Sequence, residues 1–189
     1  ADADLGRRHP LSCMIAALLA AAVYECDRVD EASELLANRL DVLERVGTPE
    51  TALLGYRTAA RIAAAKGVEH RALDLLEMLY AVGVARNLPR LCVASLGEQV
   101  RMHAGRFRSE TCRALVQRID EIVAAHAASE GPVWRAAVEL LQRLAHAHAL
   151  IGAQEWAAAE GALADALKLV ESAKLGRWRI EIMALRALA

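Results

Sequence analysis

Four prolines divide this 189-residue chain at nearly even distances. Pro10, Pro49, Pro89 and Pro132 stand 39, 40 and 43 residues apart. Proline is tolerated in the first turn of a helix, where the amide hydrogen that it lacks would have no partner in any case. The spacing therefore predicts that a helix begins at each proline.

A second break follows each proline after 16 to 20 residues, at Asp27, Gly67, Gly105 and Gly152. The segment "ARIAAAKGVEHRALDLLEML" (60–79) shows its form, because a run of small residues stops at Lys66-Gly67 and restarts almost at once. A kinked single helix would not recur in this way, and a four-helix bundle would not need eight or nine helices. Each cycle therefore predicts one helical hairpin that stacks on its neighbours.

The expected fold is an all-α, right-handed α-solenoid of about four and a half helical hairpins that forms a single domain over residues 1–189. The hairpins are placed at about 10–47, 49–83, 89–129 and 132–175, with a partial fifth at 177–189. The sequence "GTPE" (47–50) fits this arrangement well. Gly47 would end one helix, Thr48 would cap the next, and Glu50 would lie near the positive end of that helix.

Close packing within a hairpin calls for a small side chain soon after the break. Ala32, Ala72 and Ala157 each stand five residues after a break, where a small side chain lets the two helices approach. Glu110 holds this position in the third hairpin. Either Cys112 replaces it after a local shift, or that hairpin is packed more loosely.

Composition narrows the class of protein. Apolar residues make up 56% of the chain and aromatic residues 4%, so Ala, Leu and Val must supply the core. The 23 basic residues balance 24 acidic ones, which leaves no overall field that favours nucleic acid or an anionic membrane. The longest apolar stretch, residues 11–26, is shorter than the roughly 20 residues that cross a bilayer. We expect a cytoplasmic protein, and the missing initial Met and the helical C-terminal end indicate a piece of a larger chain.

Several segments resemble a known family. "YECDRVDEASELL", "AARIAAAKGVEHRALDLLE" and above all "NLPRLCVASLGEQVRMHAGRF" are similar to the tetratricopeptide-like (TPR-like) sensor region of MalT-like bacterial regulators, which are LuxR-class STAND proteins. The similarity covers most of residues 10–170. In that family an ATPase module precedes the superhelical sensor region, and a helix-turn-helix DNA-binding domain follows it.

The resemblance implies a sensing and autoregulatory role in transcription. The expected partners are a small-molecule inducer or a protein or peptide, together with the other domains of the parent chain. The segment itself has no GxxxxGK[ST] loop, and Lys66, Lys168 and Lys174 are its three lysines. We therefore expect it neither to hydrolyse nucleotide nor to bind DNA directly.

No pattern of reactive residues predicts an enzyme, a cofactor or a metal site. The two histidines of "HAH" (146–148) point about 200° apart on a helix and cannot grip one ion. His103 and His126 sit among helical residues with ordinary roles. Trp134, Trp156 and Trp178 recur every 22 residues, and exposure would decide between core packing and a stacking platform for a ligand.

The resemblance also places a groove. In TPR-like superhelices the first helix of each hairpin lines the concave surface, at positions about 3, 6 and 10 before the turn. The polar or aromatic residues at these positions form the candidate ligand or partner groove: Tyr24, Arg57, Arg61, Ser95, Gln99, Gln142 and His146.

Two arginines in this set leave alternatives open. Arg57 and Arg61 are one helical turn apart and would repel each other unless an anionic or polar ligand, or an acid such as Glu25 or Glu98, lies near them. In the sensor hypothesis, a bound signal favours one curvature of the superhelix. The alternative function is a protein-docking scaffold without a small ligand, which an open groove rather than a closed pocket would favour.

Overall fold

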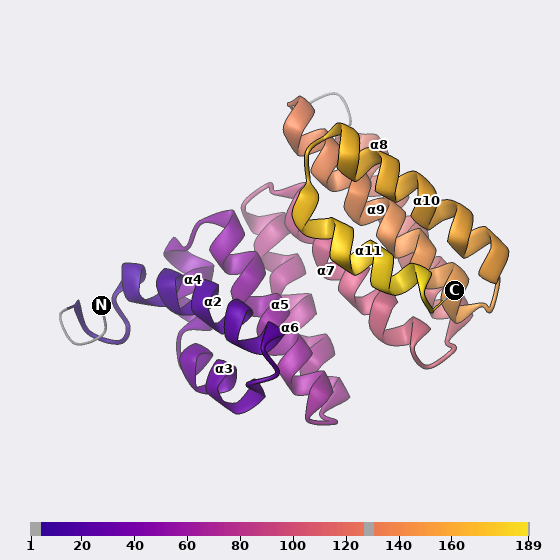
Figure 1. Ribbon diagram of the computed structural model, residues 1–189. Helices are drawn as coiled ribbons and strands as arrows, with labels where there is room; N and C mark the ends of the chain where they lie inside the picture. The colour runs from indigo at the N-terminus through magenta and orange to yellow at the C-terminus, as the bar shows by residue number, and fades with distance from the viewer. Residues whose placement is uncertain (1–4, 127–130, 189) are drawn as a thin grey trace. The chain divides into compact units, whose positions relative to one another are not determined.

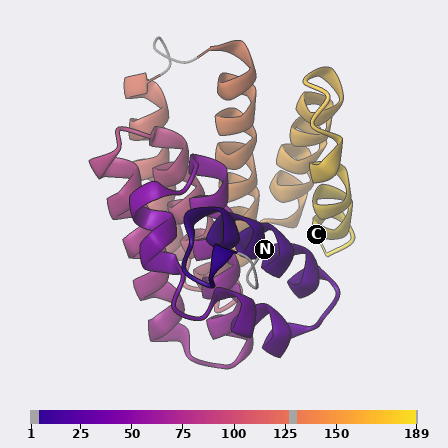
Figure 2. The same cartoon turned by 90° about the vertical axis from the view of Figure 1, so that its left-hand side faces the viewer.

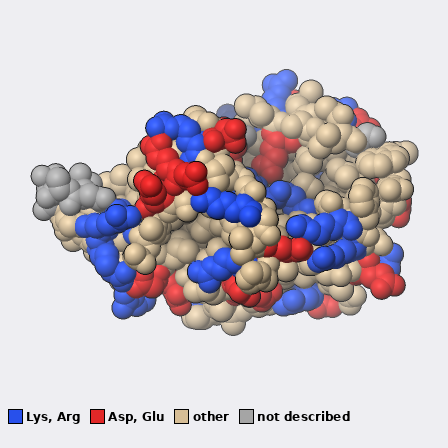
Figure 3. Space-filling model, turned by 90° about the horizontal axis from the view of Figure 1, so that it is seen from below, with Lys and Arg blue, Asp and Glu red and all other residues tan. Residues whose placement is uncertain are grey.

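The computed structural model describes residues 5–126 and 131–188, apart from the side chains of residues 132–134 and 177. Every regular element among these residues is a helix, which confirms the all-α prediction (Figure 1). The chain divides between Leu91 and Cys92 into two compact units, and each is described by itself. Acidic and basic side chains are intermingled on the surface seen in Figure 3, in keeping with the balanced composition.

From Pro10 to Ala85, the first unit contains the helices α2 (Pro10–Glu25), α3 (Val29–Leu36), α4 (Leu40–Val46), α5 (Pro49–Ala65) and α6 (Glu69–Ala85). Helix α2 packs on α3, α4 and α5, and α5 also packs on α6. The core between them consists mostly of small and branched aliphatic side chains. Its buried members are Cys13, Ala17, Ala20, Val23, Ala32, Leu36, Val42, Leu43 and Ile62.

The second unit contains α7 (Pro89–Ala104, whose first three residues are counted with the first unit), α8 (Ser109–His126), α9 (Pro132–Gly152), α10 (Trp156–Ser172), a short 3₁₀ turn (Gly176–Trp178) and α11 (Arg179–Arg186). Helix α9 packs on α8 and α10, and α10 packs on α11. Figure 2 shows α10 and α11 side by side. The core of this unit is formed by Leu140, Leu144, Ala147, Leu163, Ala166, Val170 and Ile182.

The prolines begin helices as predicted. Pro10, Pro49, Pro89 and Pro132 are the first residues of α2, α5, α7 and α9. The cap at Thr48 is also confirmed, since its Oγ1 accepts a hydrogen bond from the backbone N–H of Thr51 at 3.3 Å. The cap holds one of the first amide groups of α5, which has no partner within the helix.

One type of turn recurs at the helix ends. A residue with positive φ is followed by a residue whose N–H bonds back to the carbonyl five residues earlier, over 2.8–3.2 Å. This is the hydrogen-bond pattern of the Schellman motif, which satisfies carbonyl groups left over at the end of a helix. The positive-φ residues of these turns are Asp27, Gly67, Asn87, Phe107, Gln154 and Lys174.

Two of the predicted breaks were therefore placed two residues too early. The left-handed residue of the third and fourth turns is Phe107 and Gln154, not Gly105 and Gly152. Gly152 is needed for a different reason, because a Cβ there would lie 2.8 Å from the Cα of Ala104. The glycine lets α9 approach α7 closely, so it marks a helix contact and not a change in backbone conformation.

The corrected turns explain the exception at Glu110. Five residues after the left-handed residue stand Ala32, Ala72, Cys112 and Ala159, which are all fully buried. Cys92 holds the same position after Asn87 and is 5% exposed. Glu110 and Ala157 are exposed. The shift to Cys112 is thus the correct alternative, and the prediction for Ala157 was wrong by two residues.

The second helix of the first predicted hairpin is broken. Instead of one helix, α3 and α4 are joined by Ala37, Asn38 and Arg39, and Asn38 adopts φ 58°. Asparagine tolerates this left-handed conformation better than most residues. We call these three residues the elbow.

Replacing Gly67 by alanine should test the turn geometry. Its φ is +76° and no atom lies within 4 Å of the place that a Cβ would occupy, so the change should destabilise the chain by about 1 kcal/mol through backbone strain alone. Gly161→Ala, in the interior of α10 with equally open space, should stabilise it by about 1 kcal/mol. Urea unfolding measures both, and the same sign for the two variants would contradict this account.

Substitution with leucine should test the corrected register. Ala72→Leu places a large side chain at a fully buried position and should destabilise the protein by about 1–3 kcal/mol. Ala157→Leu adds the same atoms at an exposed position and should change stability by less than about 0.5 kcal/mol. A large loss for Ala157→Leu, measured by urea unfolding, would mean that the predicted position was correct after all.

Candidate functional site

The elbow carries an arginine into the interior of the first unit. Only 2% of the surface of Arg39 is exposed. Its Nη1 donates a hydrogen bond of 3.0 Å to the backbone carbonyl of Ser12 in α2. Burying a guanidinium is unfavourable unless neighbouring groups compensate for the lost water, so Arg39 is the most unusual charged residue of this unit.

A cavity of about 330 Å³ lies beside the elbow. We call it the elbow pocket. It combines an apolar wall from four helices with a small number of polar groups. Its polar lining residues are Ser33, Asn38, Arg39, Asp41 and Arg71, and its apolar ones are Leu36, Ala37, Leu40, Ala59, Ile62 and Leu75.

The one carboxylate of the elbow pocket is already bound by two arginines. Arg8 and Arg45 both make ion pairs with Asp41, the second over 3.1 Å, and Arg8 also donates to the carbonyl of Asn38 at 2.8 Å. Burial alone would raise the pKa of the Asp41 carboxyl, but the hydrogen bond and charge of Arg8 and the charge of Arg45 outweigh it and hold the pKa below its ordinary value. The guanidinium groups of Arg39 and Arg71 then dominate the charge of the lining.

Helices α4 and α5, which both contribute to the pocket lining, are packed tightly against each other. The hydroxyl of the fully buried Tyr56 donates a hydrogen bond of 3.1 Å to Oε2 of Glu44. Burial, and then the charge of Glu44, raise the pKa of Tyr56, so it stays a neutral donor. A Cβ on Gly55 would lie 2.6 Å from Cδ1 of Leu43, so the glycine is what allows α4 to lie so close to α5.

The groove residues of the first unit are partly engaged with protein groups. Arg61 pairs with Glu25 at 3.5 Å, and the Arg61 side chain is 16% exposed. The sequence left open whether a ligand or an acidic residue lies beside Arg61, and the structure shows the acidic residue Glu25. Arg57 is half-buried, and Tyr24 packs against the hydrophobic core.

The groove residues of the second unit fall into two groups. Ser95 and Gln99 are buried in α7. Gln142 and His146 come together on α9, where both bind Oδ1 of Asp120 from α8, at 2.7 and 2.9 Å. They form a polar clamp between two helices.

The corrected turns also move the positions assigned to this groove. Counting back 10 and 6 residues from Phe107 gives Gly97 and Arg101 in place of Ser95 and Gln99. The same count from Gln154 gives Leu144 and His148 in place of Gln142 and His146. Arg101 pairs with Glu98 at 2.8 Å.

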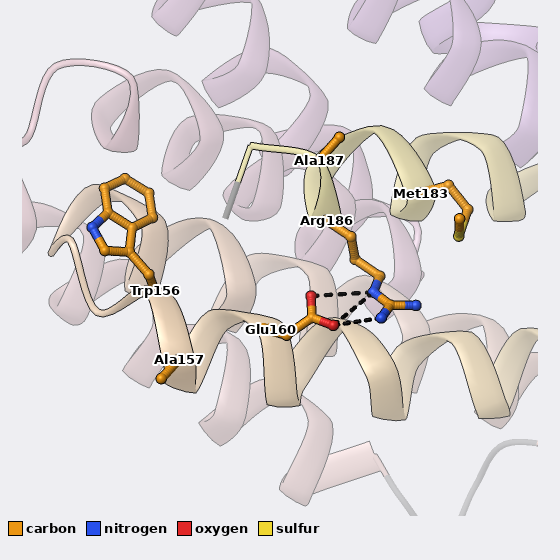
Figure 4. A pocket seen from close by; sticks show the side chains of 6 residues that line it. All are labelled: Trp156, Ala157, Glu160, Met183, Arg186 and Ala187. Atoms are coloured by element: carbon orange, nitrogen blue, oxygen red, sulfur yellow. Dashed lines mark hydrogen bonds and ion pairs between the residues drawn. The ribbon is translucent and has the colours of Figure 1, made fainter.

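A second, wider pocket of about 510 Å³ lies between α10 and α11. Figure 4 shows Arg186 of α11 directed toward Glu160 of α10, with Trp156 and Met183 at the two sides. Nε of Arg186 bonds both carboxylate oxygens of Glu160, at 3.0 and 3.1 Å. The hydrogen bond to Arg186 lowers the pKa of Glu160, so these two charges neutralise each other and do not favour a charged ligand.

The tryptophans have different surroundings. Trp178 is partly buried against the core of the second unit, which agrees with the packing role. Trp156 is 42% exposed at the edge of the wider pocket. Its indole ring is therefore accessible for a ligand to stack on. The side chain of Trp134 lies outside the described residues.

Other reactive groups offer little chemistry. Among residues 5–126 and 131–188, no three His, Cys, Asp or Glu side chains gather in a way that could hold a metal ion. Burial raises the pKa of the thiols of Cys92 and Cys112. Within the same part of the chain, every helix is too short or too polar to span a bilayer.

The elbow pocket was not predicted from the sequence. The segment "LANRL" (36–40) contains a single residue that favours a left-handed turn, Asn38. A surface position can carry the same residue within a continuous helix. Arg39 is buried because the helix is broken between α3 and α4, and no local sequence pattern predicts that break.

Comparisons with known proteins identify no relative. No protein-family model matches the chain, and neither a curated protein nor a solved structure is significantly similar to it.

The ion pairs of Asp41 should make stability depend on pH. Because the folded state favours the ionised carboxyl, its contribution is complete above the unfolded-state pKa of about 3.9 and disappears as pH falls through the lower folded-state value. Asp41→Asn should lower the free energy of unfolding at pH 7 and flatten its dependence on pH between roughly 2 and 5. Urea unfolding across this range measures the effect. Equal flattening by Asp74→Asn, a change at an exposed carboxylate of α6, would contradict the prediction.

Proposed function

We propose that this chain is a non-catalytic sensor module that binds a small anionic ligand in the elbow pocket. It would serve as the signal-sensing region of a bacterial regulator of the MalT-like LuxR class, which its sequence resembles. In such a protein the ligand acts as inducer, and the ATPase and DNA-binding parts of the parent chain respond to it. The observation that carries the proposal is a cavity lined by the buried guanidinium of Arg39 and by Arg71.

The size and lining of the elbow pocket suit a small molecule. Pockets for small ligands typically measure about 300–1,000 Å³ and combine apolar walls with a few polar groups that fix orientation. The elbow pocket has this volume and this mixture. Arginine presents a planar set of donors that matches a carboxylate or phosphate, so Arg39 and Arg71 favour a ligand with such a group.

The elbow offers a means of coupling. Helices α3 and α4 meet at three residues outside any helix, and both helices line the pocket with α5 and α6. A ligand that contacts all four helices binds best at one angle between α3 and α4. It would therefore shift the population toward that angle by its difference in affinity.

A docking scaffold without a small ligand is the second candidate. The observation that favours it is the row of exposed apolar side chains on α2, including Leu11, Ile15 and Leu18. In this alternative, Tyr24 and Arg57 would contact a protein or peptide in the groove.

A thermal-shift screen with inorganic phosphate, citrate, a hexose phosphate and the matching neutral hexose tests the ligand class. We expect at least one of the anions, and not the neutral sugar, to raise the melting temperature. Arg71→Gln should weaken binding of that anion at least tenfold, or by about 1.4 kcal/mol, because it removes a charged donor from the lining.

Arg113→Gln provides the matched control, since Arg113 is an exposed arginine of α8 far from the elbow in sequence and outside the pocket lining. It should leave anion binding unchanged. An equal loss in both variants would show a nonspecific charge effect. No response to any of the anions would exclude the proposed ligand class.

A further inference from the structure

The wider pocket between α10 and α11 combines two large apolar side chains with one ion pair. Trp156 and Met183 expose 42% and 48% of their surface. Figure 4 shows them on the two sides of the pair formed by Glu160 and Arg186. Single exposed apolar residues are common on protein surfaces. Here, however, both line one pocket, whose volume of about 510 Å³ lies in the range of small-molecule sites.

Helical spacing brings these four side chains together. Trp156 and Glu160 stand four residues apart on α10, and Met183 and Arg186 stand three apart on α11. Residues at these intervals share one face of a helix, so each helix contributes one apolar and one charged side chain to the pocket. The remaining lining residues are small and leave space beside the ion pair: Ala157 and Ala187.

The ion pair keeps bonding capacity for another molecule. Nε of Arg186 bonds both carboxylate oxygens of Glu160, and Nη2 donates to Oε1. Within residues 5–126 and 131–188, these bonds leave Nη1 of Arg186 to donate elsewhere, and they leave Oε2 of Glu160 with one more bond to accept. The two side chains are 32% and 44% exposed. The pair therefore presents a donor beside an acceptor to the pocket.

Charge and shape restrict the class of ligand. A charged molecule would be attracted by one member of the pair and repelled by the other, so the pocket favours an uncharged one. The accessible indole of Trp156 favours a flat ring, and a thioether such as that of Met183 also makes favourable contacts with aromatic rings. Nucleobases are flat rings that stack on aromatic side chains and on arginine guanidinium planes.

The donor and acceptor of the pair match one edge of a 6-oxopurine. In guanine and hypoxanthine the O6 carbonyl accepts hydrogen bonds and the adjacent N1–H donates one. Nη1 of Arg186 would donate to O6, and Oε2 of Glu160 would accept from N1–H. A free sugar lacks the aromatic face, and a hydrocarbon ring lacks the polar edge.

We infer that the wider pocket binds an uncharged 6-oxopurine nucleoside, with its base against Trp156 and its O6–N1 edge on the pair of Glu160 and Arg186. The wider pocket shares no lining residue with the elbow pocket. The inference therefore stands or falls independently of the proposed anionic ligand.

Two-dimensional NMR of the isotope-labelled full chain, titrated with inosine up to about 20 mM, tests the site and covers dissociation constants of about 1 mM. We expect saturable shifts of the Trp156 indole N–H and of backbone amides in α11. Trp156→Ala should weaken binding about tenfold or more, because it removes the stacking face. Circular dichroism should show unchanged helicity, since alanine favours a helix. Trp156→Phe, which keeps a smaller ring, should weaken binding less.

Phe107→Ala is the matched control, because Phe107 is an aromatic residue with 63% of its surface exposed and lies outside the pocket lining. It should bind inosine like the unmodified chain. Among the ligands, 1-methylinosine lacks the N1–H donor and should bind about fivefold more weakly or worse, and ribose should cause no shift. The absence of saturable shifts with inosine would overturn the inference. Equal binding of ribose or of 1-methylinosine, unchanged binding by Trp156→Ala, or an equal loss in Phe107→Ala would also overturn it.

Discussion

The backbone turn that ends a helix with one left-handed residue is the constraint on which both units depend. Its hydrogen bond, for example from Val68 N–H to the Ala63 carbonyl at 2.9 Å, reverses the chain within three residues and fixes the phase of the next helix. The residue five positions after the left-handed one then faces the previous helix. At that place Ala32, Ala72, Cys112 and Ala159 are fully buried, because a larger side chain would hold the two helices apart.

Sequence reasoning was successful where a residue type has one strong backbone preference. Proline is so restricted that its four positions located four helix starts. Thr48 was found as a cap for a similar reason, since its hydroxyl competes for a backbone amide. Gly67 also marked its turn correctly because it supplies positive φ without strain.

The same reasoning failed where one residue type serves two purposes. Gly152 was interpreted as the turn residue of a hairpin. The structure requires a glycine there for another reason, because Ala104 packs directly against it. The actual left-handed residues, Phe107 and Gln154, have no special preference for that conformation and accept strain of about 1–2 kcal/mol. The candidate site shows this limit most clearly, since a polar pocket formed around Arg39 only because α3 and α4 are separate helices.

Cys26 differs from the other three cysteines in a way that matters for following the elbow. Its thiol is exposed, whereas those of Cys13, Cys92 and Cys112 are buried. It stands in the turn between α2 and α3, one residue from Glu25, the partner of Arg61. A maleimide fluorophore would therefore attach to the native chain at a single point, and its emission would report tilting of α3 without any engineered residue.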